Sequence, residues 1–168
     1  IKAVSSLLLL SLAAAMDIQS GKIRNRLIFT GLAAGFFFQV AEAGWKGAGV
    51  FLRNVSIPVI LCYLLFLMHA LGAGDIKLFS VIGGIWDLHI LKLTIIISFL
   101  VAAGMSLWKM LYHHNLISRL CILGKYLYQV IVTFQLPEYP KGDQGKQHII
   151  HFSIAIFIGF LVALEVAY

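Results

Sequence analysis

Long runs of apolar residues alternate along this chain with short polar turns. Such runs are typical of transmembrane helices, which need about 20 predominantly apolar residues. The pattern predicts five spans, over residues 4–16, 27–41, 56–71, 88–110 and 149–166. A further apolar run at residues 75–86 is only about twelve residues long, which is short of a full crossing at ~1.5 Å per residue.

Three other segments have different patterns. Over residues 113–135 apolar side chains recur at helical spacing with polar side chains opposite, which predicts an amphipathic helix on the membrane surface. Residues 43–54 are predicted to be a loop or a short interfacial segment. Pro58 is expected near the start of the third span, where its missing N–H donor matters least.

Composition agrees with this pattern. The 168 residues are 61% hydrophobic and only 12% charged, against about 25% charged in an ordinary soluble domain. We therefore predict an all-α membrane protein, a polytopic bundle of about six transmembrane helices with an amphipathic interfacial helix. Residues 1–168 are expected to form a single domain with no room for a separate soluble one.

The net charge of +6 does not indicate a nucleic-acid partner, because the thirteen Lys and Arg residues are scattered singly between apolar runs. They serve instead as topology signals. With six spans, the three most basic regions fall on one side, which the positive-inside rule makes cytoplasmic. These regions are the turn carrying Lys22, Arg24 and Arg26, the residues around Lys77, and residues 109–146.

Two aspartates stand at the ends of apolar runs, Asp17 after the first run and Asp75 after the turn Gly72-Ala73-Gly74. A carboxylate at membrane depth is costly, so each one indicates a functional site. Two carboxylates a few ångströms apart share a proton. The ionised member can then take a proton from an attacking water while the protonated member polarises a carbonyl. We therefore expect an aspartyl dyad.

Lys77 allows two interpretations. In the functional interpretation, its ammonium favours ionisation of the dyad or binds an acidic group of a substrate. In the structural interpretation, Lys77 is simply a lysine that snorkels to the membrane interface. His148 and His151 are three residues apart, but no third ligand is placed near them, so no metal site is expected. No other cofactor is indicated by the sequence.

Around the two acids the chain resembles the type IV prepilin peptidase family. Asp17 followed by Ile23-Arg24-Asn25 looks like that family's Asp followed by Ile-Pro-Asn, and the segment from Gly72 to Leu78 looks like its Gly-x-Gly-Asp-x-Lys-Leu motif. The resemblance implies a membrane aspartyl endopeptidase that removes the leader of prepilins or pseudopilins at the cytoplasmic face of the inner membrane. The residues that carry over are the catalytic Asp17 and Asp75 and the motif-supporting Gly72, Gly74, Lys77 and Asn25.

Two departures from the family pattern matter. Arg24 stands where the family usually has Pro, which weakens the rigid turn after Asp17. The larger bifunctional members add a region with paired CxxC motifs, whereas Cys62 and Cys121 lie singly in apolar surroundings. We therefore expect a peptidase without methyltransferase activity, in a single peptidase domain.

Two other function classes remain open. Intramembrane proteases of the presenilin type also carry GxGD, but they place the first Asp after Tyr, whereas Met16 precedes Asp17 here. A small transporter or a pilus-assembly subunit would use the two acids to bind a proton or a cation. Convergence of the carboxyl groups distinguishes the peptidase from the last class. The expected partners are a prepilin-like substrate and the lipid bilayer, and the sequence leaves the oligomeric state open.

Overall fold

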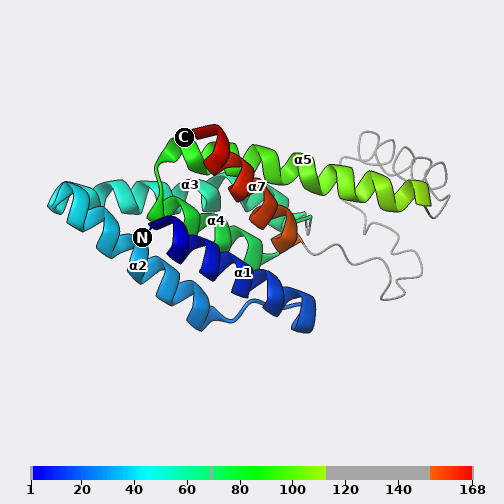
Figure 1. The fold of residues 1–168 in the computed structure, drawn as a ribbon, viewed down its shortest axis with the longest axis horizontal. Helices are drawn as coiled ribbons and strands as arrows, with labels where there is room; N and C mark the ends of the chain where they lie inside the picture. The colour runs from blue at the N-terminus through cyan, green and yellow to red at the C-terminus, as the bar shows by residue number, and fades with distance from the viewer. Residues whose placement is uncertain (1, 69, 113–151, 168) are drawn as a thin grey trace. The chain divides into compact units, whose positions relative to one another are not determined.

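The computed structural model describes residues 2–68, 70–112 and 152–167. These residues form helices, with no strand among them (Figure 1). The helices are α1 (Lys2–Ser20), α2 (Asn25–Ala43), α3 (Trp45–Leu67), α4 (Ala73–Ile85), α5 (Leu88–Tyr112) and α7 (Phe152–Ala167). The prediction of an all-α membrane bundle is confirmed. The predicted amphipathic helix at 113–135 lies outside the described residues.

Four of the described helices, α1, α2, α3 and α5, are long and apolar enough to cross a membrane. Helix α7 is apolar but shorter, with 16 residues. Helix α4 has only 13 residues, which extend about 20 Å against a hydrocarbon core of about 30 Å. The short apolar run is therefore a short helix and is not one of the four spans.

The chain divides into two compact units. The first consists of residues 1–102 together with 151–168, and the second of residues 103–150. In the second unit the described part is the last stretch of α5, where a pocket is lined by Gly104, Met105, Trp108, Lys109 and Tyr112. The two aspartates and both of their motif segments belong to the first unit.

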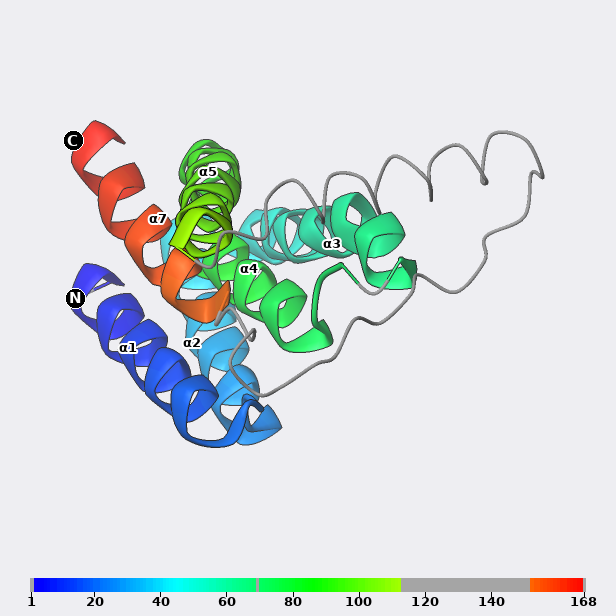
Figure 2. The ribbon, with the colours of Figure 1, turned by 90° about the vertical axis from the view of Figure 1, so that its right-hand side faces the viewer.

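Helix α4 is the centre of the first unit. It packs against α1, α2, α3 and α7, and Figure 2 shows it among these helices. Nine of its 13 residues are buried. Phe79 lies 6.1 Å from Phe152 of α7, measured between ring centroids, and 6.4 Å from Phe99 of α5. A short helix enclosed in this way can carry an acid in its first turn without contributing a lipid-facing surface.

Small residues let α2 approach α4 closely. A Cβ added at Gly31 would lie 2.7 Å from the Val81 side chain, and one at Gly35 would lie 2.8 Å from the backbone of Gly84. Any larger residue would force the helices apart. The spacing Gly31-x-x-x-Gly35 therefore serves packing, as small residues commonly do between membrane helices.

The prediction of a loop over residues 43–54 is wrong, because α3 already begins at Trp45. Gly44 has a φ of +59°, a left-handed conformation that suits glycine, and its N–H donates to the carbonyl of Val40 at 2.8 Å. This one residue reverses the chain between two helices. Gly47 then fits directly against the backbone of Gln39.

The predicted position of Pro58 near the start of a span is also wrong. Pro58 lies inside α3 and is buried. A proline there leaves the carbonyl of Asn54 without its usual intrahelical donor. That carbonyl is covered by α4, since a Cβ on Gly83 would lie only 2.6 Å from the Asn54 oxygen. Gly83 of α4 therefore packs closely against the turn of α3 that precedes Pro58.

Candidate active site

Asp17 lies in the last turn of α1, just before the chain reverses. Gly21 adopts a φ of +63°, and its N–H donates to the Asp17 carbonyl oxygen at 2.8 Å. This is a glycine stop of the kind that commonly ends helices. Asp17 is thereby fixed at the end of a span, next to the exposed turn that leads into α2.

Asp75 lies in the first turn of α4, three residues after Gly72. The Gly72 N–H donates to Asp75 Oδ2 at 3.3 Å, so the carboxylate caps the start of its own helix. A Cβ on Gly72 would lie 3.1 Å from the same oxygen, which shows why the turn carries glycine there. The helix N-terminus also offers a partial positive charge to the acid.

The two acids act on each other. Helix α1 packs against α4. Asp75 lies outside the four candidate spans. Burial and the nearby charge of Asp17 raise the pKa of the Asp75 carboxyl. The hydrogen bond from the Gly72 N–H opposes this rise. Asp75 is therefore the member of the pair that favours the protonated state. General acid and base chemistry requires one neutral and one ionised carboxyl, and the raised pKa of Asp75 favours the neutral form of that acid.

Lys77 and Asn25 tie the two motif segments together. Lys77 Nζ donates to Asn25 Oδ1 at 2.9 Å, which joins α4 to the first residue of α2. Gly74 lies against the same turn, since a Cβ there would be 3.2 Å from Ile23 Cδ1. The structure therefore places Gly72, Gly74, Lys77 and Asn25 around the acids, and it gives the Lys77 ammonium a protein partner.

Arg24 keeps the backbone geometry that proline would impose. It is the N-cap residue of α2, with φ −67° and ψ 130°. Proline holds φ near about −65°. The departure from the family pattern thus changes the stiffness of the turn and leaves its shape intact.

Sequence reasoning missed Ser153. This serine is the second residue of α7 and is only 1% exposed, and its Oγ donates to Asp17 Oδ2 at 2.6 Å. The bond connects residues 136 positions apart. No motif marks the serine, and a lone hydroxyl in an apolar run gives no signal of its partner.

The described residues contain no group of three His, Cys, Asp or Glu side chains that could hold a metal ion. His148 and His151 lie outside that part of the chain. The expectation that the reaction uses no metal or other cofactor remains a prediction.

A family model described as the type IV leader peptidase family matches residues 4–107, which include both aspartates and both motif segments. The chain belongs to the type IV leader peptidase family. Comparisons with curated proteins and with solved structures give no match. Family membership and the four candidate spans make this leader peptidase family member a membrane peptidase. Ser153 lies beyond the matched residues.

Proposed function

We propose that this protein is an aspartyl endopeptidase that removes the leader peptide of type IV prepilin-like proteins at the cytoplasmic face of the inner membrane. The observation that carries the proposal is the electrostatic interaction between Asp17 and Asp75, which come from different helices. Two carboxylates that repel each other cannot both ionise easily, so they can share one proton. The proposed chemistry requires a shared proton of this kind.

The proposed reaction uses Asp17 as the base and Asp75 as the acid. Asp17 takes a proton from water as the water oxygen attacks the scissile carbonyl carbon, and Asp75 gives its proton to the carbonyl oxygen. When the tetrahedral intermediate collapses, the C–N bond breaks and Asp17 returns its proton to the leaving amine. Asp75 regains its proton from the intermediate's hydroxyl, so both carboxyls end as they began.

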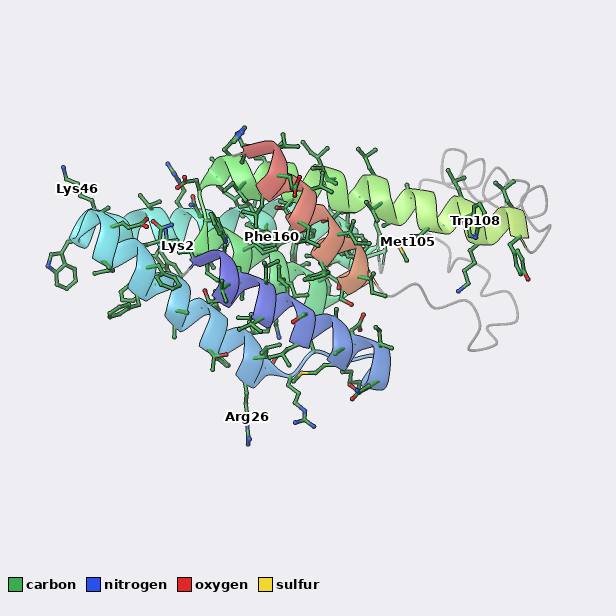
Figure 3. The ribbon with its side chains drawn as sticks, in the orientation of Figure 1. Lys2, Arg26, Lys46, Met105, Trp108 and Phe160 are labelled. Carbon is green, nitrogen blue, oxygen red and sulfur yellow. The ribbon has the colours of Figure 1, made fainter. Side chains whose placement is uncertain are left out.

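The position of the pair supports access from the interface. Asp17 and Asp75 lie at helix ends, beside the exposed residues Lys22, Arg24 and Arg26. Figure 3 shows Arg26 pointing away from the helices near the α1–α2 turn. The positive-inside rule places this turn in the cytoplasm. A basic leader followed by an apolar segment can then leave its helix in the bilayer while the junction reaches the dyad.

Co-expression with candidate prepilins from the same genome, read by a size shift, tests the proposal. We expect Asp17→Asn and Asp75→Asn each to lower leader removal by at least about a hundredfold, because each removes a proton-transfer group. Asp87→Asn is the matched control, since Asp87 is an exposed acid between α4 and α5 and should leave cleavage unchanged. Substantial cleavage by a folded Asp17→Asn or Asp75→Asn variant would contradict the proposed dyad.

A further inference from the structure

Asp17 is held by a helix that carries no part of either motif. Ser153 of α7 donates its hydroxyl hydrogen to Asp17 Oδ2 at 2.6 Å. The serine is almost completely buried. Water therefore cannot replace this donor without a change in packing.

The hydroxyl of Ser153 is used differently from that of a serine buried to the same extent. Ser98, for example, is equally buried, yet its Oγ donates to the carbonyl of Thr94 in its own helix at 2.6 Å. Such local bonds are the common use of a helical serine. Ser153 is also part of a helix, α7. Its hydroxyl is directed instead to a carboxylate on another helix.

The packing of α7 fixes the position of this donor. Phe152 lies 5.3 Å from Phe99 between ring centroids, and Ala155 and Ile156 are both fully buried. Helix α7 also packs against α1 and α4, the two helices that carry the acids. The serine can therefore hold one carboxylate oxygen at a defined place relative to both.

We infer that Ser153 is a positioning residue for leader cleavage, whose hydroxyl fixes Asp17 as the ionised, water-activating member of the pair. The inference rests on the proposed function. A donated hydrogen bond favours a carboxylate over a carboxylic acid.

Other charged groups near Asp17 must be separated from this effect. Helix α4 supplies Asp75, whose charge repels that of Asp17, and the exposed Lys77, which is bonded to Asn25. The turn into α2 supplies exposed cations, namely Lys22, Arg24 and Arg26. The acidic residue in the described part of α7 is Glu165. It lies twelve residues after Ser153, which is about 18 Å away from Ser153 along the helix. None of these groups changes when the serine hydroxyl is removed.

The test is a pH–rate profile of the purified full chain, with a prepilin as substrate. We expect Ser153→Ala to lower the maximal rate about tenfold and to move the acidic limb to higher pH, because the pair loses a hydrogen-bond donor to its singly ionised state. Ser153→Thr keeps the hydroxyl and should retain the wild-type limb. Ser98→Ala removes an equally buried serine hydroxyl that does not bond to an acid, and it should leave the limb in place.

Thermal unfolding of each variant separates folding from positioning. A Ser153→Ala profile with its acidic limb at the wild-type pH would overturn the inference, whether or not the rate falls. An equal shift in Ser98→Ala or in Ser153→Thr would also overturn it, because the hydroxyl on Asp17 would then not be the cause. Failure of the proposed function has a different signature, namely cleavage by Asp17→Asn or Asp75→Asn.

Discussion

Polar groups are arranged in opposite ways at the two ends of the first unit. At the Trp86 end, polar groups satisfy one another by hydrogen bonds: Asn54 Nδ2 donates to the Trp86 carbonyl at 3.3 Å, and Trp86 Nε1 donates to Ser6 Oγ at 2.9 Å. Ser6 Oγ in turn donates to the Lys2 carbonyl at 2.7 Å. At the other end, Asp17 and Asp75 bring two acids close enough to repel. The first arrangement contributes to stability, whereas the second costs stability.

This contrast indicates which end of the unit is the functional site. Buried polar groups that satisfy one another's hydrogen bonds belong to the packing of a fold. Like charges placed together persist only when the surrounding structure holds them, and they are typical of functional sites. Helix α1 contributes to both ends, and Trp86 directly follows α4, whose first turn carries Asp75. The choice of polar residues at each helix end therefore separates stability from function in a single bundle.

The pH dependence of cleavage is the strongest test of the claim that Asp17 and Asp75 interact. We expect a bell-shaped profile whose limbs belong to the pair. On the alkaline side activity falls as Asp75 loses its proton, and this occurs above the usual aspartate range because burial and the charge of Asp17 raise the pKa of Asp75. Beyond each limb the rate should fall about tenfold per pH unit.

Infrared titration of the Asp75 carboxyl in Asp17→Asn checks the cause directly. Removal of the Asp17 charge should lower the pKa of Asp75, while burial, the larger cause, keeps it above the ordinary value. An unchanged pKa in this variant would mean that the acids do not interact.

Asn54→Ala tests the opposite end. The substitution removes a donor to the Trp86 carbonyl from a fully buried position, so we expect the free energy of unfolding to fall by about 1–3 kcal/mol. Cleavage per folded molecule should stay within about twofold of wild type, because Asn54 does not contact the acids. Denaturation in mild detergent, alongside a cleavage assay, measures both. A folded Asn54→Ala protein without activity would show that the two ends are coupled.

The tie between Lys77 and Asn25 should have a smaller effect. Both residues are exposed, so we expect Lys77→Met and Asn25→Ala each to lower the cleavage rate by about two- to fivefold. The double variant should be no slower than either single variant, because the same bond is lost in all three. Rate losses that multiply in the double variant would mean that Lys77 acts on the substrate or the acids independently of Asn25.

Arg24→Pro should have the smallest effect, and in the stabilising direction. Arg24 already has a φ of −67°, so proline fits and chiefly reduces the freedom of the unfolded chain. We expect the free energy of unfolding to rise by about 0.4–1 kcal/mol, measured by detergent denaturation against the wild type. A loss of stability would show that the turn needs the Arg24 N–H or side chain.

Much of this molecule could be predicted from local features of the sequence. The approximate positions of the helices follow from apolar runs, because a membrane requires about 20 apolar residues per crossing. Asp17 and Asp75 could be singled out because isolated acids next to apolar runs are costly. The prediction for residues 45–54 was wrong because Gly44 alone forms the turn between α2 and α3. The residues after Gly44 have a composition typical of a loop, although they are helical.

The membrane class, the approximate helices and the two acids could be inferred from the sequence, because each depends on residues that are close in the chain. Which groups meet depends instead on how the helices pack. This packing encloses α4, joins Lys77 to Asn25 and brings Ser153 to Asp17 across 136 positions. Contacts of this kind depend on the packing of whole helices, so no spacing or motif within a single segment encodes them.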